Sequence, residues 1–199
     1  MELASPLVFA CFFFYRNSSI AAVEILLLCF WLFHYLNRAV VYPLRLSGGS
    51  KAMPVSVVVM AILFNSGNGF LNGEYLSRAA YPVGWLTDPR FIAGLLLFWT
   101  GLTVNLHSDG ILRRLRTKGD HGYRIPRGGL FRYVSCANYL GEIVEWSGWA
   151  CMTWSWAGLS FAFWTACNLV PRALSHHRWY RETFSDYPSK RRAVIPFLI

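Results

Sequence analysis

Apolar segments constrain this chain more than any other feature of its sequence. Six such runs follow one another, at about Leu3–Tyr15, Ile20–Tyr42, Ala52–Leu71, Phe91–Leu106, Tyr133–Trp154 and Ala157–Val170. A helix needs roughly 20 residues to cross the hydrocarbon core of a bilayer, so the first, fourth and sixth runs require tilt, local thinning or a partial span. Charged residues make up only 15% of the 199 residues, below the ~25% of a soluble domain. The sequence therefore predicts an all-α, polytopic transmembrane helical bundle in a single membrane-embedded domain, residues 1–199.

Basic residues are distributed unevenly between the loops on the two sides of the membrane. If the six segments alternate, one side receives only Arg16, Arg78 and Arg90, and the other receives 16 of the 19 Lys and Arg residues. Cytoplasmic loops carry the excess of Lys and Arg in membrane proteins. The 108–132 loop and the C-terminus are therefore predicted to face the cytoplasm.

The net charge of +9 also allows a nucleic-acid-binding protein. The basic residues lie between apolar runs rather than on a polar domain, which favours the lipid bilayer or an anionic cofactor as the partner and no nucleic acid. The five cysteines lie within or beside apolar runs, without C-x-x-C or zinc-type spacing, so we expect no metal. Met1 begins almost inside the first segment, which does not fit a cleavable signal peptide.

Polar residues interrupt several of the apolar runs, where each is a candidate for function. Asn138, Glu142 and Glu145 share one helical face of the fifth segment, as a polar ligand site or as a helix–helix contact. The fourth segment ends in the sequence NLHSD, followed by basic residues that also suit a helix C-terminus. The Asn65–Gly69 stretch of the third segment predicts either a pocket lining or a helix kink.

Polar residues in the C-terminal tail extend this pattern. Arg172, His176 and Tyr180 form one stripe if the last helix continues past the membrane, although a basic helix lying on anionic lipid is an alternative. Arg side chains suit phosphates, and Asn and carboxylates suit a nicotinamide carboxamide or ribose hydroxyls. The chain has neither G-x-G-x-x-G nor a P-loop, so a nucleotide would require a non-Rossmann, intramembrane site.

Several motifs together resemble the steroid 5-alpha-reductase family (3-oxo-5-alpha-steroid 4-dehydrogenases), most closely its type 2 branch. They are NLHSD at 105–109, YRIP at 123–126, GGLF at 128–131, YVSCANYLGEIVEW at 133–146, RALSHHRWY at 172–180, DYP at 186–188 and IPF at 195–197. The resemblance covers nearly the whole chain and is densest from Asn105 onward. It implies a seven-helix membrane fold, of which the first helix has no counterpart here.

The resemblance also implies a chemistry, the NADPH-dependent reduction of the 4,5 double bond of 3-oxo-4-ene steroids by hydride transfer to C5. Tyr35 matches the tyrosine that polarises the substrate carbonyl, and Glu2 matches the supporting glutamate, which we expect to be protonated in its apolar pocket. Phe64, Trp164 and Leu169 match positions that line the steroid pocket, while Asn168 replaces an aromatic residue there. The cofactor-binding positions are matched by Asn105, Asp109, Arg116, Tyr123, Arg124, Asn138, Glu142, Arg172, His176 and Tyr180.

Three other functions are compatible with parts of the pattern. The first is a membrane reductase of another lipid enone, such as an enoyl-CoA or a polyprenol. The second is a membrane methyltransferase that uses S-adenosylmethionine, and the third is a lipid-binding protein without catalysis, which the buried polar face of the fifth segment disfavours. For the reductase we expect a monomer.

Overall fold

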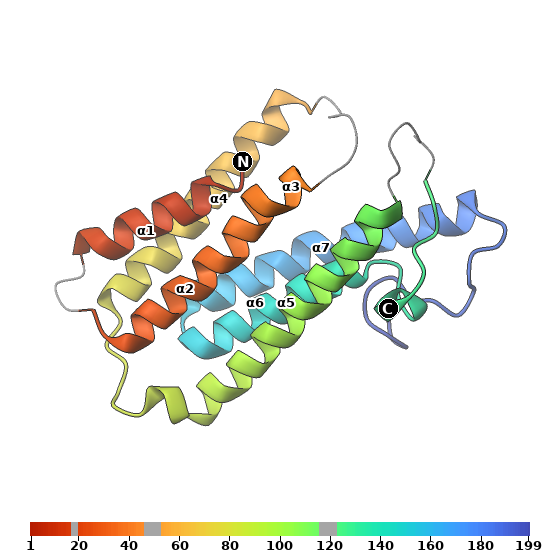
Figure 1. The fold of residues 1–199 in the computed structure, drawn as a ribbon. Coiled ribbons are helices and arrows are strands. Elements are labelled where there is room, and N and C mark those ends of the chain that lie inside the picture. The colour runs from red at the N-terminus through yellow and green to blue at the C-terminus, as the bar shows by residue number, and fades with distance from the viewer. Residues whose placement is uncertain (17–19, 46–52, 116–122) are drawn as a thin grey trace. The chain divides into compact units, whose positions relative to one another are not determined.

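Helices account for the secondary structure of the described residues, which are 1–16, 20–45, 53–115 and 123–199 of this computed structural model (Figure 1). Within those ranges the only β-pairing is an isolated parallel bridge between Val134 and Arg192. The all-α prediction is therefore confirmed. In chain order the elements are α1 Ala4–Arg16, α2 Ala22–Leu36, the π-helix η1 Asn37–Val41, α3 Tyr42–Leu44, α4 Val55–Arg78, the 3-10 helix η2 Trp85–Thr87, α5 Pro89–Leu115, the 3-10 helix η3 Gly129–Arg132, α6 Ala137–Thr153 and α7 Trp156–Thr183.

Three helical stretches of the described chain are long and apolar enough to cross a membrane. They are Ala22–Leu44, Val55–Arg78 and Pro89–Leu115, and Ala4–Tyr15 forms a shorter apolar helix. These stretches support an integral membrane protein. The count of six spans stays a prediction, because α6 has only 17 residues and α7 carries many polar residues in its second half.

The chain divides into two compact units. The N-terminal unit comprises Met1–Ile92 with Ser155–Ala157, and the C-terminal unit comprises Ala93–Trp154 and Gly158–Ile199. The expectation of a single domain stays a prediction.

In the N-terminal unit, α1 contacts both α2 and α4. Phe9 and Trp31 are fully buried, and their rings stack with centroids 4.7 Å apart. Gly69 and Gly73 allow α4 to approach α1 closely, since a Cβ on Gly73 would lie 2.6 Å from the backbone oxygen of Phe9. Small residues four apart are a common device for close packing of membrane helices.

In the C-terminal unit, glycines likewise bring α5 and α6 close together. A Cβ on Gly94 would lie 2.7 Å from the carbonyl oxygen of Gly148, and one on Gly141 would lie 2.5 Å from the amide nitrogen of Asn105. This close approach of the two backbones sets the distance across which polar side chains of α5 and α6 meet.

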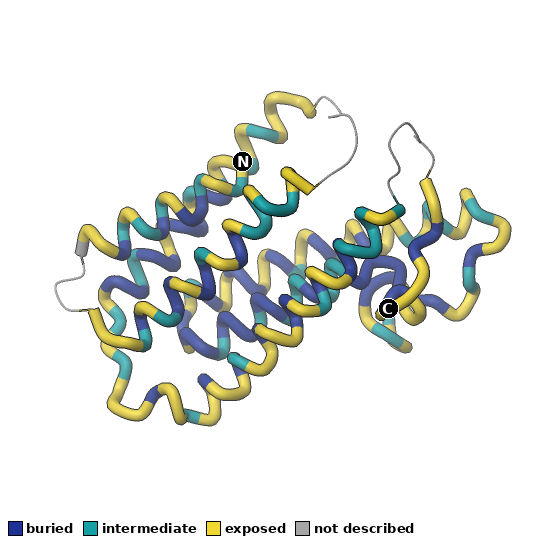
Figure 2. The backbone as a smooth tube through the Cα atoms, in the orientation of Figure 1, coloured by how far each residue is buried: buried dark blue, intermediate teal, exposed yellow. Residues whose placement is uncertain are grey.

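Helix α4 distributes its side chains as a membrane helix does. Apolar residues such as Val55, Met60 and Leu63 are exposed, whereas Asn65, Asn68 and Asn72 are buried. Figure 2 shows the exposed and buried positions along the helices. The helix runs without interruption through Asn65–Gly69, so this stretch is neither a helix break nor a loop. Its buried amides form a polar row along one side of the helix.

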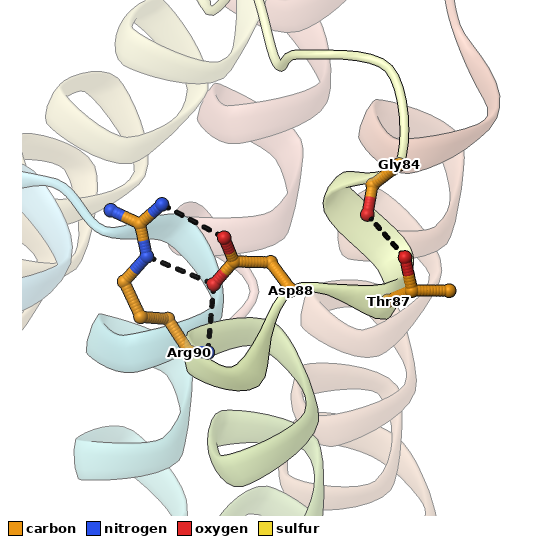
Figure 3. Close-up of polar contacts among 4 residues, drawn as sticks. All are labelled: Gly84, Thr87, Asp88 and Arg90. Atoms are coloured by element: carbon orange, nitrogen blue, oxygen red, sulfur yellow. Dashed lines mark hydrogen bonds and ion pairs between the residues drawn. The ribbon is translucent and has the colours of Figure 1, made fainter.

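The turn before α5 is fixed by Asp88, which precedes Pro89 at the start of the helix (Figure 3). Its carboxylate accepts hydrogen bonds from the backbone N–H of Arg90 at 2.8 Å and from two nitrogens of the Arg90 guanidinium at 2.9 Å. These bonds lower the pKa of Asp88 to about 2. The Arg90 guanidinium also lies 4.5 Å from the ring centroid of buried Trp85.

Candidate functional site

Tyr35 lies at the end of a row of buried amides in the N-terminal unit. Its side chain is 4% exposed, and its phenol oxygen accepts a hydrogen bond from Nδ2 of Asn68 at 3.2 Å. Asn68 in turn accepts a bond from Nδ2 of Asn72 at 3.0 Å through its own Oδ1. The spacing of four residues places both amides on one face of α4. Each amide thereby fixes the orientation of the next, and the last one fixes the Tyr35 oxygen.

Aromatic rings hold the Tyr35 side chain on the α2 side. The ring centroid of Trp31 lies 5.1 Å from that of Tyr35, and the His34 ring stands edge-on to it at 5.2 Å. Because Trp31 is fully buried and His34 is 6% exposed, the Tyr35 ring packs against buried rings, while the Asn68 amide contacts its hydroxyl.

Glu2 pairs with a cation that sequence reasoning did not assign to it. Its Oε1 lies 3.6 Å from Nε of Arg38, and the side chains of Arg38 and Glu2 are 23% and 38% exposed. Arg38 follows Tyr35 by three residues, so this pair lies about one helical turn from the phenol along the chain. A guanidinium at this distance can stabilise an ionised carboxylate, and the protonated state expected for Glu2 stays a prediction.

The predicted substrate-lining residues fall in both units. Phe64 is half-buried on α4, four residues before Asn68 and therefore on the same face as the amide that contacts Tyr35. Leu169 is 7% exposed on α7, whereas Trp164 is 52% exposed. The five-residue spacing of Trp164 and Leu169 points them to different faces of α7, so the structure does not bring these two together on one wall.

The cofactor residues of α5 and α6 meet in the C-terminal unit. Asn105, which is 1% exposed, donates from Nδ2 to the backbone oxygen of Asn138 at 3.1 Å and to Oε1 of Glu142 at 3.3 Å. This contact follows from the close approach of the two helices at Gly141. The two predicted cofactor positions of α6 therefore share one amide partner on α5.

Two further polar residues of these helices are deeply buried. Asp109 follows Asn105 by one turn of α5 and is 5% exposed, while Glu145 of α6 is fully buried. Arg116, the next predicted cofactor residue, lies outside the described residues.

Helix α7 continues past the apolar segment to Thr183, as the stripe of Arg172, His176 and Tyr180 requires. Arg172 and His176 are exposed, and the His176 ring centroid lies 6.1 Å from that of Tyr139 on α6. Tyr180 stacks on Tyr187 with centroids 5.4 Å apart. Burial, together with nearby Cys136 and Tyr187, raises the pKa of Tyr180 to about 12, so its hydroxyl keeps its proton at neutral pH.

Tyr123 and Arg124 are exposed and approach the end of α7. The Tyr123 ring is edge-on to that of Trp179 at 5.0 Å. A cavity of about 320 Å³ opens beside them, lined by Tyr123, Arg124, Ile125, Arg127, Phe184 and Asp186. Thus Asn138 and Glu142 contact Asn105, and the Tyr123 segment contacts α7, within the same unit.

A hydrogen-bonded junction of Ser135, His177 and Tyr187 was missed by sequence reasoning. Ser135 Oγ lies 2.6 Å from both Nδ1 of His177 and the hydroxyl of Tyr187, and it also donates to the backbone oxygen of Arg192 at 3.1 Å. Burial, with Arg181 and Arg192 nearby, lowers the pKa of His177. All three residues belong to motifs of the family, so the sequence marked them as candidates. It could not show that they contact one another, because the contacts form only when the C-terminal tail folds back onto Ser135.

The side chains of these residues include groups of the kind that bind nucleotides. In the described ranges, no three His, Cys, Asp or Glu side chains gather as metal ligands would. Amide and carboxylate groups of α5 and α6 can bind a carboxamide or ribose hydroxyls, and the guanidinium and imidazole groups of α7 can bind phosphates. The site-residue assignments themselves stay predictions.

Comparison with known proteins identifies relatives of this chain. A family described as 3-oxo-5-alpha-steroid 4-dehydrogenase matches residues 51–199. The human protein 3-oxo-5-alpha-steroid 4-dehydrogenase 1 is 51% identical over 179 residues, which cover 89% of this chain and 69% of the relative. Steroid 5-alpha-reductase DET2 of Gossypium hirsutum is 47% identical over 204 residues, covering 98% of this chain and 79% of the relative.

A type 2 relative is similar to the same degree. The 3-oxo-5-alpha-steroid 4-dehydrogenase 2 of Macaca fascicularis is 52% identical over 166 residues, covering 83% of this chain and 65% of the relative. These identities confirm the resemblance drawn from the motifs and do not separate the type 1 and type 2 branches.

Proposed function

This chain belongs to the 3-oxo-5-alpha-steroid 4-dehydrogenase family of oxidoreductases, and from that membership we propose that it reduces the 4,5 double bond of 3-oxo-4-ene steroids with NADPH. The observation that carries the chemical assignment is the buried Tyr35 hydroxyl, whose oxygen accepts a hydrogen bond from Asn68 at 3.2 Å. The substrate is a neutral, apolar enone, which suits a site within an integral membrane protein.

The side chains of the C-terminal unit support NADPH as the cofactor. Asn105 and Glu142, which contact each other, supply amide and carboxylate groups for the nicotinamide carboxamide and the ribose hydroxyls. Arg172, His176 and the protonated Tyr180 supply hydrogen-bond donors for phosphate oxygens. When bound, NADPH supplies the hydride that the reaction requires.

Tyr35 acts on the substrate carbonyl in this proposal. A hydroxyl that accepts a hydrogen bond through one lone pair keeps its own O–H as a donor, and the bond from Asn68 makes that donor stronger and fixes its position. Donation to the C3 carbonyl oxygen draws electron density from the enone, so C5 becomes electrophilic. The same donor then stabilises the enolate oxygen as negative charge develops.

Glu2 is the second proposed donor to that oxygen. Its carboxyl group can donate only when protonated, and the Arg38 guanidinium at 3.6 Å favours the ionised form. The donor role therefore requires Glu2 to leave its ion pair with Arg38, take up a proton and donate it in a hydrogen bond to the substrate oxygen. A buried neutral acid acting as a hydrogen-bond donor to an enolate is an established strategy in enzymes.

Orientation in the membrane is part of the proposal. The loops and tail that carry the cofactor residues also carry the excess of basic residues, which supports a cytoplasmic location for the cofactor site and the C-terminus. NADPH would thus enter from the cytoplasm and the steroid from the bilayer.

Replacement of Tyr35 by Phe tests the catalytic assignment. The variant keeps the aromatic packing against Trp31 but has no donor for the carbonyl, so we expect turnover to fall by about a hundredfold or more, as for removal of an oxyanion donor. NADPH affinity, measured by direct binding, should not change. If both quantities fall by the same factor, Tyr35 is not the catalytic donor.

A further inference from the structure

Three arginines surround a second cavity in the C-terminal unit, outside the predicted cofactor residues. The cavity has a volume of about 550 Å³ and is lined by Arg127, Gly128, Gly129, Arg132, Tyr133, Pro188 and Arg191. Among the described residues, its lining contains three guanidinium groups and no carboxylate. A cavity with this charge attracts anions.

Arg191 is the most unusual member of this lining. Its side chain is 5% exposed, and its Nε and Nη1 atoms have no hydrogen-bond partner among the described residues. The guanidinium lies 5.3 Å from the ring centroid of Tyr187, which offers a cation–π contact but no negative charge. A buried cation needs an anionic or hydrogen-bonding partner to offset its lost hydration.

The other two arginines are placed at the accessible side of the cavity. Arg132 and Arg127 are exposed, and Arg127 forms an ion pair with Asp186, with Nη2 3.1 Å from Oδ2. Asp186 is itself exposed and does not line this cavity, so it compensates Arg127 only. Gly128 and Gly129 have positive φ angles of 95° and 49°, which glycine adopts without strain. A Cβ on Gly129 would lie 2.6 Å from Cε1 of His107, so this glycine lets the cavity wall pack closely against α5.

We propose that Arg127, Arg132 and Arg191 form a binding pocket for a phosphate group. The pocket is distinct from the predicted cofactor residues, and Arg127 also lines the neighbouring cavity beside Tyr123 and Arg124. Arginine matches phosphate because its planar guanidinium donates two parallel hydrogen bonds to two phosphate oxygens. The volume of the cavity exceeds what one phosphate fills, so the group is carried either by a lipid headgroup or by a small soluble phosphate.

Thermal unfolding of the full chain in neutral detergent tests the proposal. The first arm titrates inorganic phosphate against chloride at matched ionic strength, and the second compares phosphatidylcholine nanodiscs with and without phosphatidylinositol phosphate. We expect a saturable rise in melting temperature in at least one arm. Saturation with phosphate identifies a soluble ligand, and saturation with the lipid alone identifies a headgroup.

Arg132→Gln is the decisive variant, because Arg132 is exposed and its removal spares the fold, whereas Arg191→Gln acts on a buried side chain. We expect Arg132→Gln to weaken the phosphate response about tenfold, as for loss of one charge-assisted contact. Arg178→Gln removes the same charge from an exposed position of α7 outside the cavity and should leave the response unchanged.

Three outcomes would overturn the proposal. One is the absence of a saturable response in both arms, and another is an equal loss in Arg178→Gln, which would indicate a diffuse charge effect. The third is a rise in the KM for NADPH in Arg132→Gln as large as the loss of the phosphate response, which would make the pocket a part of the cofactor site.

Discussion

At the scale of single residues, the hydrogen bond from Asn68 on α4 fixes the position of the Tyr35 hydroxyl. The resemblance of the motifs to the family was sufficient to select Tyr35 and Glu2. It did not select Asn68 or Arg38, because their partners are set by packing between α2, α4 and the N-terminal segment rather than by any local pattern. Asn68 was visible in the sequence only as one of several polar residues interrupting an apolar run.

Replacing Asn68 by Ala tests its role as a positioning residue. Loss of the bond to the Tyr35 oxygen, which costs about 1 kcal/mol for an ordinary hydrogen bond, should lower kcat by roughly fivefold to tenfold. The KM for the steroid should change little, and the melting temperature should fall by a few degrees because buried hydrogen bonds are lost. Asn65→Ala is the matched control, because Asn65 donates to the Ala61 carbonyl oxygen of its own helix and does not contact Tyr35. Equal losses of kcat in both variants would refute the role.

Substitution of Glu2 distinguishes a neutral donor from an ionised carboxylate. Glutamine donates at every pH, so Glu2→Gln should retain most of the wild-type kcat, while Glu2→Leu should lose it. Steady-state kinetics of the two variants with the same steroid provide the comparison. A Gln variant as inactive as the Leu variant would mean that the carboxylate charge, held by Arg38, is what the enzyme needs.

At the scale of the elements, glycines determine how closely the helices approach. The apolar segments predicted where helices would form, and the spacing of Arg172, His176 and Tyr180 anticipated that α7 continues beyond the membrane segment. The sequence left open whether Asn65–Gly69 lines a pocket or kinks the helix. In the structure α4 is continuous through this stretch, and the backbone of α1 fits against Gly69 and Gly73.

Gly73→Ala tests this packing. The added methyl group would lie 2.6 Å from the Phe9 oxygen and 2.9 Å from its Cα, so α1 and α4 must separate, at a cost of about 1–3 kcal/mol in the free energy of unfolding. Gly67→Ala on the same helix is the control, because a Cβ there has no atom within 4 Å. Denaturant titration in mixed micelles gives both values. Equal stability of the two variants would contradict the close packing.

The junction of Ser135, His177 and Tyr187 should respond to pH. Burial and the charges of Arg181 and Arg192 lower the pKa of His177 below 6.5 in the folded chain. As the pH falls below 6.5, the unfolded junction binds a proton that the folded one resists, so folding at the tail becomes less favourable. The loss levels off below the folded pKa, and no effect is expected above neutral pH.

Hydrogen exchange of the Ser135 and Cys136 amides reports on this junction, since they donate to the Arg192 and Ala193 carbonyl oxygens at 2.8 and 3.0 Å. Protection, corrected for intrinsic exchange rates, should decrease as the pH falls below 6.5 in the wild type and remain level in His177→Asn. The same decrease in both proteins would assign the effect to another group.

At the scale of the whole molecule, the succession of apolar runs predicted an integral membrane protein. A helix that crosses the hydrocarbon core of a bilayer needs an apolar stretch of roughly 20 residues, which a soluble fold does not need. The motifs also pointed to candidate cofactor residues on α5, α6 and α7. Two of these candidates, Asn105 and Glu142, are in contact, and the cofactor role of the set stays a prediction. Arg116 lies outside the described residues. The phosphate pocket could not be predicted, because Arg127 and Arg191 are far apart in sequence and meet only through the folded tail.

The most direct test of the account is NADPH oxidation by the detergent-purified chain, measured with and without testosterone, with the product identified by mass and stereochemistry. The account predicts NADPH oxidation that depends on the steroid and yields the 5-alpha-dihydro product. An enoyl-CoA added in competition should not be reduced in its place. Failure to bind NADPH, or reduction of the enoyl-CoA while testosterone is recovered unchanged, would contradict the account.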